Sequence, residues 1–227
     1  MRGLRAFLRD NGLSLVFGAL FIGALVFQAI AGHNEYNDEQ RQHDSEQISL
    51  SRYVTSSRFG VAVLENWQSE YLQFTLFILL TVWFLQRGSP ESKEMGKAGG
   101  ESDEQQKLGE HAKPDSPRWA RAGGLRTAIY SNSLVIVMGL IWIGSWFAQT
   151  VSGWTDQNGE RLGHHLDTLS YLDYLGTANF WERSLQNWQS EFLAVGSMAI
   201  LAVYLRQRGS PESKPVGAPH HATGVEG

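Results

Sequence analysis

Four polar side chains stand within otherwise apolar parts of the chain, and they are the residues that could do chemistry there. Each of two glutamates ends an Asn-Trp-Gln-Ser-Glu pentapeptide, and each of two glutamines lies in a long uncharged stretch. A pair of carboxylates inside a membrane could bind a cation or a proton. Alternatively, the glutamines donate hydrogen bonds that lock helices together, and the glutamates suit the first turn of a helix. The predicted polar layer consists of Gln28, Glu70, Gln149 and Glu191.

Other chemistries find little support. His164 and His165 have acidic neighbours and could bind a metal, but adjacent side chains diverge on a helix and the first half of the chain has no matching His pair. We therefore expect no metal site and no cofactor. The absence of cysteine excludes disulfides and a thiol nucleophile. Neither a Gly-rich phosphate loop nor a Ser/His/Asp arrangement is visible, so we expect no enzyme.

The elements that must position these residues are four apolar stretches. Residues 13–31 and 134–152 are uncharged and close to the roughly 20 residues needed to cross about 30 Å of hydrocarbon. Residues 71–85 and 192–205 are shorter, but they become long enough if each helix begins at the preceding Asn-Trp-Gln-Ser-Glu. Aromatic and basic residues then flank these two spans as interfacial anchors, namely Trp67, Arg87, Trp188 and Arg208.

The first stretch also resembles a signal peptide. Basic residues precede it, and Ala29-Ile30-Ala31 at its end looks like a cleavage site. Against cleavage, the related stretch 134–152 lies in mid-chain, where no signal peptide can be. We therefore interpret residues 13–31 as a span and leave cleavage as the alternative.

The chain contains an internal repeat at an offset of 121 residues. From Asn66 to Lys93, 16 of 28 positions are identical to those 121 residues later, and Gln-Arg-Gly-Ser-Pro-Glu-Ser-Lys recurs unchanged at 207–214. The same offset aligns Gln28 with Gln149. We predict two tandem helical hairpins. Because each has an even number of spans, both enter the membrane from the same side, unlike inverted repeats.

Charge predicts the orientation. The termini and the central linker carry 14 of the 19 Lys and Arg residues, whereas the two outer loops carry an excess of acids. The positive-inside rule places both termini and the linker in the cytoplasm. Apolar residues interspersed in the outer loops predict short amphipathic helices lying on the outer surface.

The domain prediction follows from these boundaries. The fold class is all-α, with four transmembrane helices. The segments are a first hairpin at 1–93 with spans at about 12–31 and 66–86, a disordered linker at 94–124, a second hairpin at 125–214 with spans at about 133–152 and 187–207, and a disordered tail at 215–227.

The repeated Gln-Arg-Gly-Ser-Pro-Glu-Ser-Lys motif ends each hairpin. Its Arg suits a helix C-terminus, its Gly suits the left-handed residue beyond it, and Ser-Pro-Glu is typical of the start of another short helix. A repeated exposed motif could also dock a partner. Together with the Asn-Trp-Gln-Ser-Glu starts, these motifs resemble a family of bacterial integral membrane proteins catalogued as a domain of unknown function. The resemblance covers nearly the whole chain and implies no activity, cofactor or catalytic residue.

Composition alone hides this organisation. A mean hydropathy of -0.25 and a net charge of -4 suggest an acidic soluble protein, and the balance makes nucleic acid an unlikely partner. Resolved along the chain, the averages combine apolar spans with polar loops. We expect a multi-pass protein of the bacterial inner membrane, whose partners are the lipid bilayer and a second copy or another membrane protein. Its expected role is structural or interactive; the alternative is a small channel or transporter that uses the Gln/Glu layer.

Overall fold

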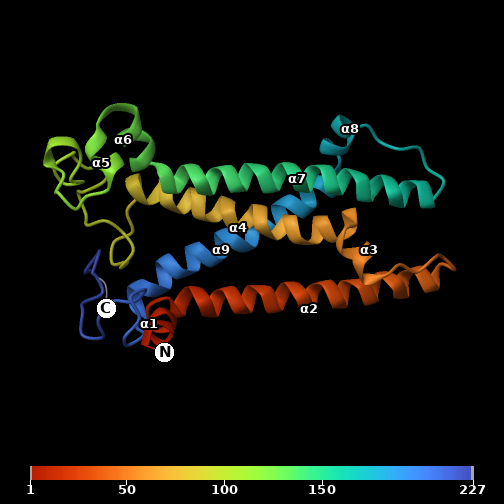
Figure 1. The fold of residues 1–227 in the computed structure, drawn as a ribbon, viewed down its shortest axis with the longest axis horizontal. Helices are drawn as coiled ribbons and strands as arrows, with labels where there is room; N and C mark the ends of the chain where they lie inside the picture. The colour runs from red at the N-terminus through yellow and green to blue at the C-terminus, as the bar shows by residue number, and fades with distance from the viewer. Residues whose placement is uncertain (1, 226–227) are drawn as a thin grey trace. The chain divides into compact units, whose positions relative to one another are not determined.

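The computed structural model describes residues 2–225, and every regular element in that range is a helix, which confirms the all-α prediction. The helices, labelled in Figure 1, are α1 (Arg2–Asp10), α2 (Gly12–Gln42), α3 (Leu50–Val54), α4 (Ser57–Trp83), η1 (Gly109–His111), α5 (Arg118–Ala122), α6 (Gly124–Ser131), α7 (Ser133–Gly163), α8 (Tyr171–Leu175) and α9 (Ala178–Tyr204). Short helices α3 and α8 stand where the sequence predicted them. That they lie on a membrane surface stays a prediction.

Helix bounds recur at the offset of the sequence repeat. The bounds of α2, α3 and α4 become those of α7, α8 and α9 when 121 is added to each number. The caps recur as well: the Ser49 hydroxyl accepts a hydrogen bond from the Arg52 N–H, and the Ser170 hydroxyl accepts one from the Asp173 N–H. A serine side chain at this position satisfies one of the unpaired N–H groups of a helix start. The same local sequence signals thus produce the same local structure.

The predicted spans need correction at their ends. Helix α2 continues beyond Ala31 to Gln42, and α7 continues beyond Ser152 to Gly163. Helices α4 and α9 begin well before Asn66 and Asn187, but end at Trp83 and Tyr204, short of the predicted ends at residues 86 and 207. The residues directly after the first and third apolar stretches include poor helix formers such as Gly32 and Gly153, yet both helices continue through them, so neither the loss of apolar character nor weak local propensity ends these helices.

Within residues 2–225, two helices, α2 and α7, are long and apolar enough to cross a membrane. Four such helices were predicted. The other two long helices, α4 and α9, carry most of their charged and amide residues in their first halves, so the uninterrupted apolar part of each helix is short. Only 6% of the apolar window of α2 and 17% of that of α7 is buried within the structure. Large apolar side chains such as Leu13, Phe17 and Phe27 are therefore exposed along α2.

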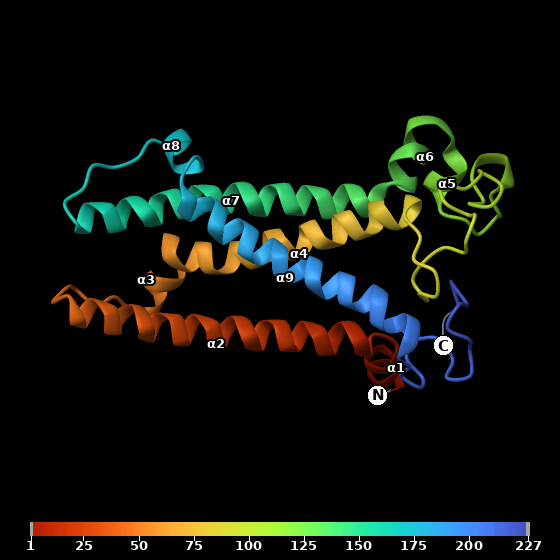
Figure 2. The same cartoon turned by 180° about the vertical axis from the view of Figure 1, so that it is seen from behind.

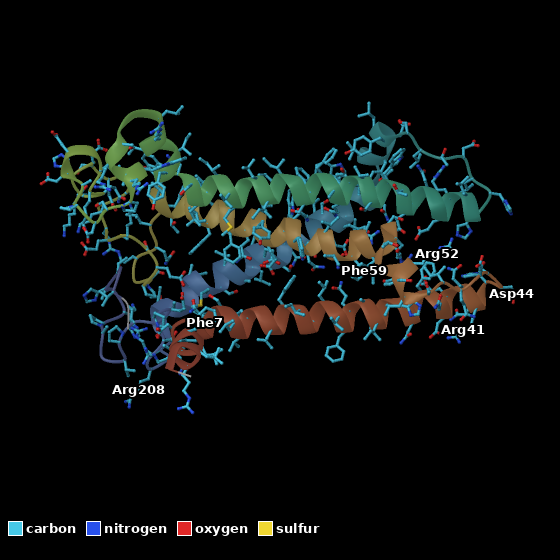
Figure 3. All side chains as sticks on the ribbon, in the orientation of Figure 1. Phe7, Arg41, Asp44, Arg52, Phe59 and Arg208 are labelled. Carbon is cyan, nitrogen blue, oxygen red and sulfur yellow. The ribbon has the colours of Figure 1, made fainter. Side chains whose placement is uncertain are left out.

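The described residues fall into two compact units. The first unit contains residues up to 63 together with 152–168, and the second contains 64–151 together with the residues from 169 onward. In the first unit, α3 packs on α2 through Tyr53, whose hydroxyl lies where a Cβ on Gly32 would stand. Figure 3 shows Phe7 near one end of α2 and the charged Arg41 and Asp44 near the other.

The second unit is held by α4, α7 and α9. Helix α9 crosses α4 in both views (Figures 1 and 2). The Trp188 indole N–H on α9 donates to Gln68 Oε1 on α4 at 2.8 Å, and the Trp146 ring on α7 meets the Trp188 ring at a centroid distance of 5.5 Å. The predicted linker 94–124 contains the short helices η1 and α5 between turns. Its predicted disorder, like that of the tail, stays a prediction.

Candidate functional site

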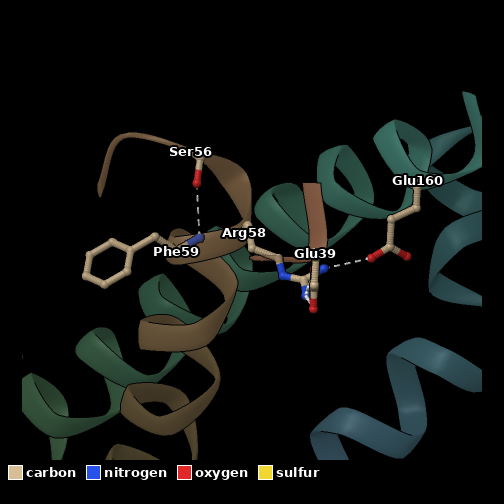
Figure 4. Close-up of polar contacts among 5 residues, drawn as sticks. All are labelled: Glu39, Ser56, Arg58, Phe59 and Glu160. Carbon is tan, nitrogen blue, oxygen red and sulfur yellow. Dashed lines mark hydrogen bonds and ion pairs between the residues drawn. The ribbon is translucent and has the colours of Figure 1, made fainter. Parts of the chain in front are cut away.

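An arginine in the first unit lies between two glutamates (Figure 4). Arg58 Nη2 donates to both carboxylate oxygens of Glu39 at 3.1 Å, and Arg58 Nη1 donates to Glu160 Oε1 at 3.0 Å. The two glutamates come from α2 and α7 and are 121 residues apart, so they occupy corresponding positions of the sequence repeat. The residue that corresponds to Arg58 is Asn179, so the repeat supplies two carboxylates but only one guanidinium.

Local structure places Arg58 in the first turn of α4. The Ser56 hydroxyl accepts a hydrogen bond from the Phe59 N–H at 3.3 Å, which caps the start of the helix (Figure 4). The same hydroxyl donates to the Tyr53 carbonyl oxygen at 2.6 Å. The Tyr53 and Phe59 rings pack at a centroid distance of 5.5 Å. The cap and the ring contact together fix the direction in which Arg58 leaves the helix.

Matching turns end the two helices that carry the glutamates. Asp44 and His165 follow α2 and α7 in the left-handed conformation, with φ of 49° and 58°. The next N–H in each turn reaches back to a helix carbonyl at 2.8 Å, from Ser45 to Gln40 and from Leu166 to Arg161. Each glutamate therefore stands about one turn before its helix end.

A polar pocket of about 830 Å³ surrounds the arginine. Its charged and titratable lining consists of Tyr36, Glu39, His43, Arg58, Asp156, Glu160 and His164. His43 and His164 correspond in the repeat, a match that a search for adjacent histidine pairs overlooks. Three carboxylates face one guanidinium, so the pocket is acidic at neutral pH.

The acidic surroundings act on the arginine itself. Burial lowers the pKa of Arg58, but Glu39, Asp156 and Glu160 raise it by more, so the pKa lies above its usual value. The guanidinium is therefore firmly charged and joins the ends of α2, α4 and α7. The pocket could attract cations from water, although no group of three or more His, Asp or Glu in residues 2–225 is arranged to hold a metal ion.

The predicted polar layer divides between the two units. Gln28 belongs to the first unit, where its amide donates to the Ala62 carbonyl oxygen at 3.2 Å. In the second unit, Glu70 lies close enough to Glu191 to interact with it electrostatically, and the Ser69 hydroxyl hydrogen-bonds Glu191. Gln149 is 2% exposed, and its Oε1 has no hydrogen-bond partner. The structure thus places the two glutamates within range of electrostatic interaction.

The four predicted anchors all lie in the second unit. Arg87 and Arg208 are exposed, and Trp67 is 38% exposed. That these residues lie at a membrane interface stays a prediction. Trp188 is half-buried and belongs to an aromatic cluster with Trp142, Trp146 and Phe180. Sequence reasoning missed this cluster because two of its members, Trp142 and Trp146, lie in an apolar stretch, where a Trp carries no separate signal.

The two Gln-Arg-Gly-Ser-Pro-Glu-Ser-Lys segments of the second unit fold alike. Gly88 and Gly209 have left-handed φ of 86° and 79°. In the first copy the Ser92 hydroxyl accepts a hydrogen bond from the Gln86 N–H, and in the second copy the Ser213 hydroxyl accepts one from the Gln207 N–H, both at 2.9 Å. The helix predicted at Ser-Pro-Glu is wrong, because this hydroxyl closes the segment into a turn. The final lysines, Lys93 and Lys214, donate to the carbonyl oxygens of Gly99 and His220, each six residues on.

The folded motifs bring two further carboxyls together. Glu91 is half-buried and hydrogen-bonds the carboxyl of Glu212, its counterpart in the repeat. Burial first, and then Glu212, raise the pKa of Glu91 to about 7. Two carboxyls can form such a bond only if one is protonated. The repeated motif marked Glu91 and Glu212 as corresponding residues, but nothing in the sequence indicated that the two copies of the motif lie close together.

A family profile described as "Domain of unknown function (DUF6766)" matches residues 4–225. Neither the curated proteins nor the solved structures contain a match. Because the profile covers nearly the whole chain, from α1 to the tail, the chain belongs to the DUF6766 family of domains of unknown function.

Proposed function

We propose that the chain is a multi-pass protein of the bacterial inner membrane with a structural or interaction role, built from two tandem hairpins with four spans. The observation that carries the proposal is the exposure of α2 and α7, whose apolar windows are only 6% and 17% buried. Patches of this size require an apolar environment, and lipid supplies one. The bilayer is then the first partner, and a second copy or another membrane protein is the next.

The recurrent helix bounds support the hairpin part of the proposal. Helices α4 and α9 end in exposed apolar residues, including Trp83 at 65% and Leu201 at 50% exposure. Their second halves would therefore lie in the membrane, with the polar first halves at the outer surface. Both termini and the linker are then cytoplasmic, in agreement with the excess of basic residues there.

Single cysteines test this topology directly, because the native chain has none. We expect a membrane-impermeant maleimide to label Asp44→Cys and Asp167→Cys in intact cells, and Arg5→Cys, Lys107→Cys and His221→Cys only after permeabilisation. If α2 and α7 alone crossed the membrane, position 107 would be labelled from outside and position 167 would not. A soluble chain recovered without membranes would contradict the proposal altogether.

The alternative, a small channel or transporter, draws support from the approach of Glu70 to Glu191. It requires water to reach both carboxylates and requires their charge. The double variant Glu70→Gln and Glu191→Gln separates the two functions. A structural role predicts normal assembly without a change in ion or proton flux in reconstituted vesicles, whereas a transporter predicts loss of a measurable flux.

A further inference from the structure

The second unit contains an apolar groove that runs along α4 and α9. Its volume is about 360 Å³, within the range of about 300–1,000 Å³ typical of ligand pockets. The walls are almost wholly apolar, and the turn of the first Gln-Arg-Gly-Ser-Pro-Glu-Ser-Lys motif closes one end with Gln86, Ser89, Glu91 and Ser92. An occupant would therefore need a long apolar body and a polar head.

Small residues on α9 open the groove. Gly196 and Ala199 line it, and nothing stands within 4 Å of the position that a Cβ on Gly196 would take. The corresponding residue of the first half is Thr75, which is 7% exposed and has its hydroxyl bonded to the Tyr71 carbonyl oxygen. The groove thus depends on a difference between the two halves of the chain.

The length of the groove fits one leaflet. From Gln73 to Thr81, the α4 wall covers eight residue steps, which at 1.5 Å each is about 12 Å, and Phe84, Leu85 and Gln86 continue the wall beyond the helix end. This length is close to half of a hydrocarbon core of about 30 Å. In the proposed topology the motif end of the groove is cytoplasmic, so an acyl chain of the inner leaflet would have its headgroup beside Glu91.

Within residues 2–225, no basic side chain is paired with Glu91 at the head end of the groove. Glu91 hydrogen-bonds Glu212, so two acidic groups meet there. Two lysines line a neighbouring pocket together with Glu91, and both already have partners: Lys93 pairs with Glu101 at 3.1 Å, and Lys97 pairs with Glu94 at 2.7 Å. Charge complementarity therefore favours an occupant whose head is a hydrogen-bonding cation.

Building on the proposed function, we propose that this groove binds phosphatidylethanolamine, with one acyl chain between α4 and α9 and the primary ammonium between Glu91 and Glu212. The ammonium supplies the hydrogen-bond donors that the two carboxyls otherwise obtain by sharing a proton. Phosphatidylcholine carries the same charge without N–H donors, and phosphatidylglycerol has no cation. The headgroup series therefore separates hydrogen bonding from charge and from simple apolar contact.

The test uses the full chain in nanodiscs that contain the three phospholipids in equal amounts and with identical acyl chains. After the protein is released from the nanodiscs, the lipid molecules that remain bound to it are counted by native mass spectrometry. We expect one phosphatidylethanolamine to be retained about threefold to tenfold over phosphatidylcholine. Glu91→Gln should remove this preference, and Gly196→Leu should remove the retained lipid whatever its headgroup.

Matched controls change the same chemistry elsewhere. Glu110→Gln alters an exposed carboxylate in the linker, and Gly144→Leu adds the same bulk at an open position on α7, so both should retain the preference. Equal retention of the three lipids, or variants of Glu91 and Gly196 that behave like the native chain, would overturn the inference and leave the membrane proposal standing. Failure of the native chain to enter nanodiscs would overturn both.

Discussion

Replacing Arg58 should destabilise the first unit more than replacing any other arginine in its outer loops. Arg58 makes ion pairs of 3.1 and 3.0 Å with Glu39 and Glu160, and its side chain is 35% exposed. Exposed pairs contribute about 0.2–1 kcal/mol each. Two pairs on one planar guanidinium, together with the repulsion between the carboxylates once the cation is gone, amount to about 1.5 kcal/mol. This lowers the folding equilibrium constant roughly tenfold.

The variants separate charge from geometry. Arg58→Met keeps the apolar stem and should lose the full amount, whereas Arg58→Lys should lose about half because an ammonium cannot donate to both glutamates as a fork does. Unfolding in mixed detergent and SDS micelles, followed by the fluorescence of the eight tryptophans, measures the free energy of unfolding. Arg52→Met, an exposed arginine on α3, is the matched control and should change it by less than about 0.5 kcal/mol.

A double-mutant cycle gives the decisive result. If Arg58 acts through Glu160, the pair Arg58→Met and Glu160→Gln should show a coupling of about 0.5 kcal/mol or more, which shrinks at 1 M salt. The reasoning is refuted if Arg58→Met unfolds like the native chain and the coupling is zero. It is also refuted if the loss is the same for Lys and Met, because the fork geometry would then contribute nothing.

Three further changes test other parts of the structure. Gly32→Ala should cost about 1–3 kcal/mol in the same unfolding assay, since its Cβ would stand 2.3 Å from the Tyr53 hydroxyl, while Gly18→Ala at an open position should cost nothing. His165→Gly should stabilise by about 0.5 kcal/mol, because φ is 58° and a left-handed side chain costs more than the added freedom of glycine. The raised pKa of Glu91 means that the protonated form favours folding, so stability should fall as the pH rises from about 4.5 to about 7, and Glu91→Gln should flatten that part of the profile.

The sequence predicted the parts of the fold that local signals determine. The all-α class followed from four apolar stretches of helical span length related by the 121-residue repeat, and the short helices α3 and α8 followed from apolar residues interspersed in the outer loops. The ends of the helices were harder to predict from the sequence. The ends of α2 and α7 depend on left-handed turns at Asp44 and His165, where a glycine would have marked the boundary and none stands. Sequence patterns indicate a helix end poorly when an unusual residue adopts the turn.

The sites depend on tertiary contacts that no local pattern encodes. Glu39 and Glu160 could have been paired by the 121-residue offset, yet the offset says nothing of Arg58, whose counterpart is an asparagine. Likewise, the repeated motif gave Glu91 and Glu212 the same local turn, but their meeting requires the two motifs to converge in one unit. Of the four residues of the predicted polar layer, Glu70 and Glu191 lie close enough to each other to interact electrostatically.

The two halves of the chain differ where their sites are. Positions that the halves share, such as the capping serines and the motif lysines, have folding explanations, because each satisfies backbone groups that any copy must satisfy. Arg58 opposite an asparagine and Gly196 opposite a threonine meet no requirement that both halves share: the first pairs with two glutamates in an acidic pocket, and the second lines an apolar groove. Since shared folding requirements keep corresponding residues alike, we expect substitutions at these two positions to affect one half of the chain without a counterpart effect in the other.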